Sequence, residues 1–178
     1  FGAALAINSS SASLHNNIGN LQLLRDNVDE AISSFSRAVD LSPRHSGALV
    51  NWGVALQKCT RFEESLDPLI RAIIIEPENH NTLKILAASL VSIESPQYDD
   101  ALEDIIPKIL QTRGVVRPKE ISYFVTSFIK SNPEIKLAIK SINSCKKPGT
   151  LMDAITSFVK SPTALSILKT SPICDIEF

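Results

Sequence analysis

Apolar residues recur every three or four positions along most of this chain, which is the spacing of one face of an α-helix. Polar breaks at 25–27 and 58–60 divide the first part into segments, and Asn27 and Thr60 are the predicted caps of the helices that follow them. The pattern predicts helices at about 12–25, 28–41, 46–59 and 62–75. Apolar and polar residues do not alternate strictly anywhere, as they would in a half-buried strand, so we expect an all-α fold.

A 34-residue period links these helices in pairs. Identical residues recur at this interval three times: Gly19 and Gly53, Ala38 and Ala72, and Pro43 and Pro77. A fixed period of this length is typical of stacked helical repeats. Glycine and alanine let two helices approach to the close end of the ~8–10 Å packing range. Proline lacks an amide donor and therefore ends a helix.

The residues at fixed places within each period resemble the tetratricopeptide repeat family. Counted from Ala12, the first unit has Gly19, Ala31, Phe35, Ala38 and Pro43 at the expected positions. The second unit starts at Ser46 and has Trp52, Gly53, Leu56, Ser65, Leu69, Ala72 and Pro77. Ser65 replaces the usual alanine, and Leu69 replaces the usual aromatic residue. The resemblance implies a tetratricopeptide-type α-solenoid, a right-handed superhelix of helix pairs.

A third unit begins near His80, and its pattern degenerates in the second half. The loop at 94–97 is about two residues longer than the earlier ones, and the apolar pattern resumes at Tyr98. Pro107 removes a backbone hydrogen bond in the middle of the following helix, at a cost of roughly 3 kcal/mol. We therefore expect a kink, or the effective end of that helix, near Ile106.

The first residues also follow the period. Ala4 lies one full period before Ala38, and Ile7 lies one full period before Leu41. Residues 4–8 thus match the last turns of a second helix. We expect the chain to open inside an array and to be a fragment of a longer protein.

The period is lost after Gly114, although apolar stripes continue. The helix predicted to begin at Pro118 has the stripe Ile121, Phe124, Val125, Phe128 and Ile129, and further helices are predicted from Pro133 to Leu168. These stripes need a partner surface, so we expect a C-terminal helical cap that seals the open end of the array. The predicted organisation is an array at 1–113 (a partial repeat at 1–11 and repeats at about 12–45, 46–79 and 80–113), followed by a non-repeat region at 114–178.

The tail at 167–178 is weakly similar to the connector of bacterial proteins that join tetratricopeptide repeats to a methyltransferase domain. This resemblance implies an alternative function. The chain would be the non-catalytic, substrate-recruiting arm of a larger transferase, either a methyltransferase or a glycosyltransferase, with its catalytic domain beyond Phe178.

Composition narrows the class of protein. Apolar residues make up 44% and charged residues 21%, which is ordinary for a globular chain. No apolar run approaches the roughly 20 residues of a membrane helix, so we expect no membrane partner. The three cysteines, Cys59, Cys145 and Cys174, are far apart and match neither a disulfide framework nor a zinc site. Free thiols favour a reducing compartment, and we expect a cytoplasmic protein.

Charge is unevenly distributed. Residues 1–107 hold 7 Lys/Arg against 14 Asp/Glu, a net charge of −7, whereas residues 108–178 hold 11 against 5, a net charge of +6. The lysines from 130 to 147 are spread over two predicted helices with few arginines. This spread favours a solvated face, or one docked on an acidic neighbour, over a nucleic-acid site.

The resemblance places the binding groove on the first helix of each unit. Its predicted lining is Asn16, Asn17, Asn20, Leu23, Val50, Asn51, Val54 and Lys84. Asn17 and Asn51 are equivalent, and a carboxamide can pair with a peptide backbone. This arrangement is similar to the asparagine ladder of O-linked N-acetylglucosamine transferases, and it ends at Ile85 in the third unit. The competing interpretation is that these asparagines serve solubility or local hydrogen bonding.

We expect no catalysis within these residues. His15, His45 and His80 form no recognisable constellation with a nucleophile, and no glycine-rich phosphate loop exists. The acidic cluster at 99–104 is typical of a solvated surface, so we expect neither a metal nor a cofactor. The sequence therefore predicts a non-enzymatic protein-interaction module, a scaffold that binds a peptide or a helix in the concave groove. Self-association through exposed array ends is left open.

Overall fold

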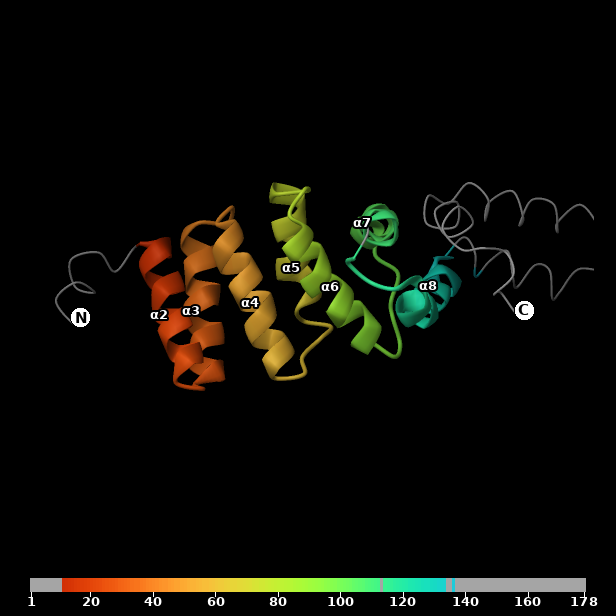
Figure 1. The fold of residues 1–178 in the computed structure, drawn as a ribbon. Helices are drawn as coiled ribbons and strands as arrows, with labels where there is room; N and C mark the ends of the chain where they lie inside the picture. Colours follow the sequence, from red (N-terminus) through yellow and green to blue (C-terminus); the bar gives the residue numbers. More distant parts are fainter. Residues whose placement is uncertain (1–10, 113, 134–135, 137–178) are drawn as a thin grey trace, which may run out of the picture. The chain divides into compact units, whose positions relative to one another are not determined.

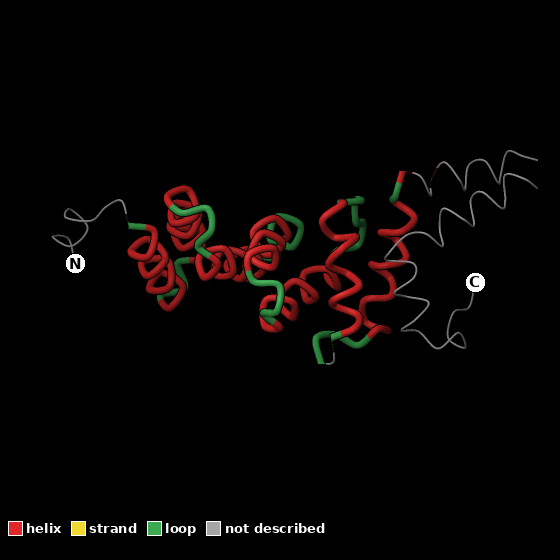
Figure 2. The backbone as a smooth tube through the Cα atoms, turned by 90° about the horizontal axis from the view of Figure 1, so that it is seen from above, coloured by secondary structure: helices red, strands yellow, loops and turns green. Residues whose placement is uncertain are grey.

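The computed structural model describes residues 11–112, 114–133 and 136, and every regular element in these residues is an α-helix (Figure 2). The chain divides into two compact units, Phe1–Ser89 (unit 1) and Leu90–Phe178 (unit 2), which are described separately. The partial repeat before residue 11, the helices predicted after Pro133 and the tail at 167–178 lie outside the described residues. The domain boundary at 113/114 stays a prediction. None of the described helices is long and apolar enough to cross a membrane.

The helices of unit 1 follow the 34-residue period. In chain order they are α2 (Ala12–Leu24), α3 (Val28–Leu41), α4 (Ser46–Lys58), α5 (Leu66–Ile75) and α6 (His80–Ser92), the last of which continues into unit 2 (Figure 1). Helix α3 packs against α2 and α4, α5 packs against α4, and α2 also contacts α4. The predicted bounds are therefore confirmed to within a residue for α2, α3 and α4.

Helix α5 is the exception, because it begins at Leu66 and not at residue 62. The amide of Ser65 donates to the carbonyls of both Arg61 and Phe62, and the amide of Leu66 donates to the carbonyl of Glu63. This mixture of tight and α-helical bonds forms turns, so the regular helix starts only after them. The N-cap residue of α5 is accordingly Ser65, and the prediction that Thr60 caps this helix is wrong.

Thr60 instead closes α4. Thr60 has φ of 58°, and its equivalent in the first repeat, Asp26, has φ of 62°. In both turns the next amide, of Asn27 or Arg61, donates to a carbonyl five residues earlier, at 2.9 and 3.0 Å. These bonds form the Schellman motif that satisfies the last carbonyls of a helix. Asn27 is the N-cap residue of α3 as predicted, although its side chain makes no capping hydrogen bond.

Side-chain caps also recur at the period, before each first helix. The side chains of Ser11, His45 and Asn79 accept hydrogen bonds from the amides of Leu14, Ala48 and Thr82, at 3.4, 3.1 and 3.2 Å. Each bond satisfies an amide in the first turn that has no partner within the helix. Three residue types thus perform one task at the same place in successive periods, which a search for identical residues does not find.

The repeated glycines mark the closest helix contact in each pair. A Cβ atom added to Gly19 would lie 2.5 Å from the ring of Phe35, and one added to Gly53 would lie 2.6 Å from Cγ of Leu69. Phe35 and Leu69 are fully buried. The missing side chain therefore allows the second helix of each pair to insert its large residue against the first helix.

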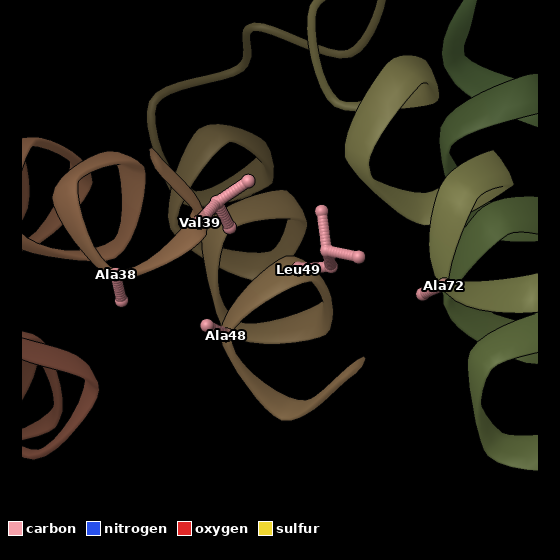
Figure 3. Packing of buried hydrophobic residues seen from close by; sticks show 5 residues of the cluster. All are labelled: Ala38, Val39, Ala48, Leu49 and Ala72. Carbon is pink, nitrogen blue, oxygen red and sulfur yellow. The ribbon is translucent and has the colours of Figure 1, made fainter. Parts of the chain in front are cut away.

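Two apolar clusters join consecutive pairs. One contains Ala38, Val39, Ala48, Leu49 and Ala72, which come from α3, α4 and α5 (Figure 3). The other contains Ala31 and Phe35 of α3 with Ala55 of α4. Small residues on both sides keep α4 close to α3. The indole of Trp52 packs against both clusters.

Unit 2 contains α7 (Asp100–Gln111) and α8 (Pro118–Ser131). Helix α7 continues past Pro107 to Gln111, so the alternative that it ends near Ile106 is wrong, and the alternative of a kink there stays a prediction. Leu102, Ile105, Ile106 and Ile109 are buried, and their burial stabilises the helix on both sides of the proline.

Helix α8 begins at Pro118 as predicted, and four members of its apolar stripe are buried: Ile121, Phe124, Val125 and Phe128. The ring of Phe128 stacks on Tyr98 at 5.3 Å and on Phe124 at 5.9 Å. The Tyr98 hydroxyl donates to the carboxylate of Glu103, which raises the pKa of this phenol. The apolar stripe of α8 therefore has packing partners of its own, although the 34-residue period has ended before this helix.

Candidate functional site

The predicted groove residues lie on three first helices of unit 1. Asn16, Asn17, Asn20 and Leu23 are on α2, Val50, Asn51 and Val54 are on α4, and Lys84 is on α6. The α2 and α4 residues come together because these two helices are in contact. Asn17 and Lys84 are exposed, and the other six are half-buried.

Three asparagines form a hydrogen-bonded group, which we call the carboxamide cluster. Nδ2 of Asn51 donates to Oδ1 of Asn16 at 2.9 Å and to Oδ1 of Asn20 at 3.1 Å. Asn17, the repeat equivalent of Asn51, is not part of the cluster. The structure therefore joins Asn51 to its neighbours on α2, and the pairing of Asn17 and Asn51 with a peptide backbone stays a prediction.

These bonds fix which polar atoms of the cluster stay available. An amide group has two protons, and Asn51 donates both of its protons to α2. Its Oδ1 atom remains as an acceptor. Asn16 and Asn20 accept through their oxygens, which leaves their NH₂ groups as donors. The cluster thus presents donors on α2 beside an acceptor on α4.

Apolar groove residues next to the cluster also belong to the core. Leu23 packs against the buried group formed by Ala31, Phe35 and Ala55, and Val50 packs against the cluster shown in Figure 3. Both side chains keep a partly exposed surface. Their positions are therefore fixed by packing before any ligand binds.

A second polar group, the buried serine chain, contains Gln57, Ser65 and Ser89. Nε2 of Gln57 donates to Oγ of Ser89 at 2.5 Å and to the carbonyl of Ile85 at 2.7 Å. The two serine oxygens are 2.7 Å apart, and Ser65 donates to the carbonyl of Phe62 at 2.6 Å. Because each hydroxyl has one proton, Ser89 must donate to Ser65.

The sequence alone did not predict the buried serine chain of Gln57, Ser65 and Ser89. Ser65 was visible as a departure from the usual alanine, but its partner Ser89 lies far along the sequence, on α6. Ser65 and Ser89 are fully buried, and their bonds satisfy both hydroxyls. The two serines therefore link the turn before α5 to α6 inside the protein, and the half-buried Gln57 joins them from α4.

The described residues show no group of three or more His, Cys, Asp or Glu side chains that could hold a metal ion. His45 is occupied as the cap of α4. The ion pairs Arg61–Glu64 and Arg71–Asp67 are exposed and join neighbouring turns of one segment. On the first-helix face, Lys84 is the cation among the predicted groove residues.

Comparison with known proteins finds similarity among solved structures. No protein-family model matches the sequence, and no curated protein matches it. The solved structures similar to this chain include YrrB, described as a TPR (tetratricopeptide repeat) protein with an unusual peptide-binding site. The sequences are 17% identical, the alignment covers 95% of this chain and 97% of that chain, and the TM-score is 0.48.

The fold assignment follows from the internal geometry of unit 1. Side-chain caps, left-handed turns and glycine contacts recur at the same period as the helices. A repeat of this length, built as a helix–turn–helix with small residues at the helix contacts, is the tetratricopeptide type. The helices of residues 12–75 therefore form two 34-residue helix–turn–helix repeats in an all-α fold, with the small-residue contacts of the tetratricopeptide type.

Proposed function

We propose that the first-helix face of unit 1 binds an extended segment of a partner protein, so that the chain acts as a protein-interaction module. The carboxamide cluster is the observation that carries this proposal. Three half-buried asparagines from two helices are held in place by the two hydrogen bonds of Asn51. Polar groups fixed in advance lose little side-chain entropy when a ligand binds.

The available atoms of the cluster fit a peptide main chain. Asn16 and Asn20 have N–H groups to donate to main-chain carbonyls, and Asn51 has an oxygen that accepts from a main-chain amide. An extended segment presents both kinds of group along its length. Such pairing reads the backbone of the partner and not its side chains.

Apolar and charged neighbours supply further selectivity. Leu23, Val50 and Val54 offer partly exposed apolar surface beside the cluster, and Asn17 and Lys84 are exposed. Binding is then a matter of shape and hydrogen bonding, without covalent chemistry. A single lysine among these residues does not favour a carboxylate-specific clamp, which needs several cations.

The test uses the full chain and a displayed library of random peptides. The Kd of an enriched peptide is measured by fluorescence anisotropy for the wild type and for the double variant Asn17→Ala/Asn51→Ala. We expect binding to weaken about ten-fold or more, because the variant loses the acceptor of Asn51, the bonds that hold Asn16 and Asn20, and the exposed carboxamide of Asn17. The circular dichroism spectrum and the melting temperature of the double variant should equal those of the wild type.

The matched control is Asn27→Ala, which removes an exposed asparagine that makes no capping bond and lies between α2 and α3. This variant should bind the peptide as the wild type does. Unchanged affinity in a folded double variant would exclude the asparagines from the binding site. Equal weakening by Asn27→Ala would show that the effect does not belong to this face.

A further inference from the structure

The charges of unit 1 are divided between its first and second helices. Residues 1–89 contain nine Asp or Glu, and all nine lie on α3, on α5 or in the turns. Helices α2, α4 and α6 contain none, and apart from histidines their ionisable residues are Lys58 and Lys84. The first helices are therefore neutral or basic, although residues 1–89 as a whole hold only seven Lys or Arg against the nine acids.

Lys84 has no acidic partner within the part of the chain that the structure describes. Its side chain is exposed, and the ion pairs at Arg61, Arg71 and Arg117 lie elsewhere. The residues one turn away on α6 also offer no carboxylate; they are His80, Asn81, Ala87 and Ala88. The ammonium group of Lys84 is therefore available to a carboxylate from another molecule.

Lys84 also belongs to a row of equivalent positions on the three first helices. Asn16, Val50 and Lys84 are one period apart, and each is the fifth residue of its helix. Helix α4 contacts α2 directly, and the side chain of Gln57 joins α4 to α6. A segment that crosses the first helices thus meets an amide donor, then half-buried apolar surface and then a cation.

We propose that the segment bound by the first-helix face has an Asp or Glu side chain that pairs with Lys84, so that Lys84 determines the specificity of this face. The inference rests on the proposed function, because it names the chemistry of the same partner. A basic residue at that place would meet a like charge, and the first helices have no acid that could accept it.

The two parts of the face thus have different tasks. The carboxamide cluster pairs with the main chain and is indifferent to side chains, whereas Lys84 reads one side chain. One lysine gives a preference at one position of the segment and does not form a clamp. The nine acids of residues 1–89 disfavour nucleic acid as the source of the negative charge, since phosphate backbones bind surfaces that are basic throughout.

The test repeats the selection from the displayed random library on the full chain and on its variant Lys84→Glu. The displayed peptides are fused at their C-termini, so their carboxylates come from side chains. Peptides selected on the wild type should be enriched in Asp or Glu at one position. Peptides selected on Lys84→Glu should be enriched in Lys or Arg at that position.

Affinities then measure the charge swap. The probes are one peptide selected on the wild type, amidated at its C-terminus, and its counterpart with lysine in place of the selected acid. The acidic peptide should bind Lys84→Glu about five-fold or more weakly than the wild type, because an exposed ion pair is replaced by a repulsion. The lysine peptide should show the reverse order. Both differences should shrink at ~1 M salt, where exposed charges are screened.

The matched control is Lys58→Glu, which changes the net charge equally at an exposed position of α4 outside the predicted groove lining. This variant should keep the preference for the acidic peptide. Equal weakening by Lys58→Glu, or equal affinity of Lys84→Glu and the wild type, would overturn the inference. If the peptide still depended on Asn51, the proposed function would survive that result. Failure to select any peptide on the wild type would overturn both.

Discussion

Helix α4 extends one carboxamide side chain toward each neighbouring first helix, and the two differ in environment. Asn51 joins two half-buried asparagines of α2. Gln57 is half-buried like Asn51, but it joins Ser89 of α6, which is fully buried with its partner Ser65. Near the surface, water or a ligand can replace a lost hydrogen bond. In the interior nothing replaces it, and the loss appears as instability. The same chemistry therefore favours binding at Asn51 and stability at Gln57.

The largest effect on the unfolding free energy is expected at the close contact between the two helices of a repeat, on which both carboxamide contacts depend. Gly19→Ala would place a Cβ atom 2.5 Å from the ring of Phe35, which is fully buried and cannot move aside without disturbing its neighbours. Overpacking of this kind costs roughly 1–3 kcal/mol in unfolding free energy, even though alanine favours the helix. Chemical denaturation followed by circular dichroism measures the loss.

Gly47→Ala is the matched control for that prediction. A Cβ atom at Gly47 meets only the ring of His45, at an ordinary 3.5 Å. This variant should be as stable as the wild type or slightly more stable, because alanine is the better helix former. A Gly19→Ala variant as stable as Gly47→Ala would show that the close contact does not determine the packing of the pair.

The next largest effect concerns the buried serine chain. Ser65→Ala removes the acceptor of the Ser89 hydroxyl, whose oxygen still accepts from Gln57 but whose proton is left buried without an acceptor, at a cost of about 1–2 kcal/mol. The double variant Ser65→Ala/Ser89→Ala removes both groups and should recover part of that loss. A double-mutant cycle from denaturation curves gives the coupling energy.

Ser33→Ala provides the comparison for the serine chain, because the Ser33 hydroxyl donates to the carbonyl of Asp29 in an exposed position. Its effect on the unfolding free energy should be small, since water replaces the bond. Additive effects of Ser65→Ala and Ser89→Ala on the unfolding free energy would argue against a continuous series of hydrogen bonds from Gln57 through the two serines to the carbonyl of Phe62.

The smallest effect is expected at the left-handed turns. Thr60→Gly should stabilise the protein by up to ~1 kcal/mol, because a β-branched residue is strained at a φ of 58°. Asp26→Gly should gain less, since aspartate tolerates this conformation better than threonine. Melting temperatures of the two variants test the difference. A gain at Asp26 larger than that at Thr60 would contradict this interpretation of the turns.

The sequence predicted the helices of unit 1 and their period because identical small residues recur where helices touch. It did not predict which residue caps α5, because Ser65 takes that place only through the tight bonds of residues 62–65. Of its two alternatives at Pro107, a kink or the end of α7, the end is wrong, because burial of the apolar residues around Pro107 offsets the lost hydrogen bond. Burial of this kind depends on distant parts of the chain.

The groove residues were predicted from repeat position, which brings Asn16, Asn20 and Asn51 to one face but does not define their bonds. A ladder of Asn17 and Asn51 follows from position alone. The observed cluster depends on which α2 side chains reach Asn51 across the contact between α2 and α4. Gln57 and Ser89 gave no sequence signal, because neither residue type repeats at their positions.

The most direct test of this account compares Asn51→Ala with Gln57→Ala in two measurements, peptide affinity and melting temperature. Asn51→Ala should weaken binding of the selected peptide and keep the melting temperature of the wild type. Gln57→Ala should lower the melting temperature while the folded fraction binds the peptide normally. Loss of stability without loss of affinity in Asn51→Ala would contradict the account, because the carboxamide cluster would then serve the fold and not a ligand.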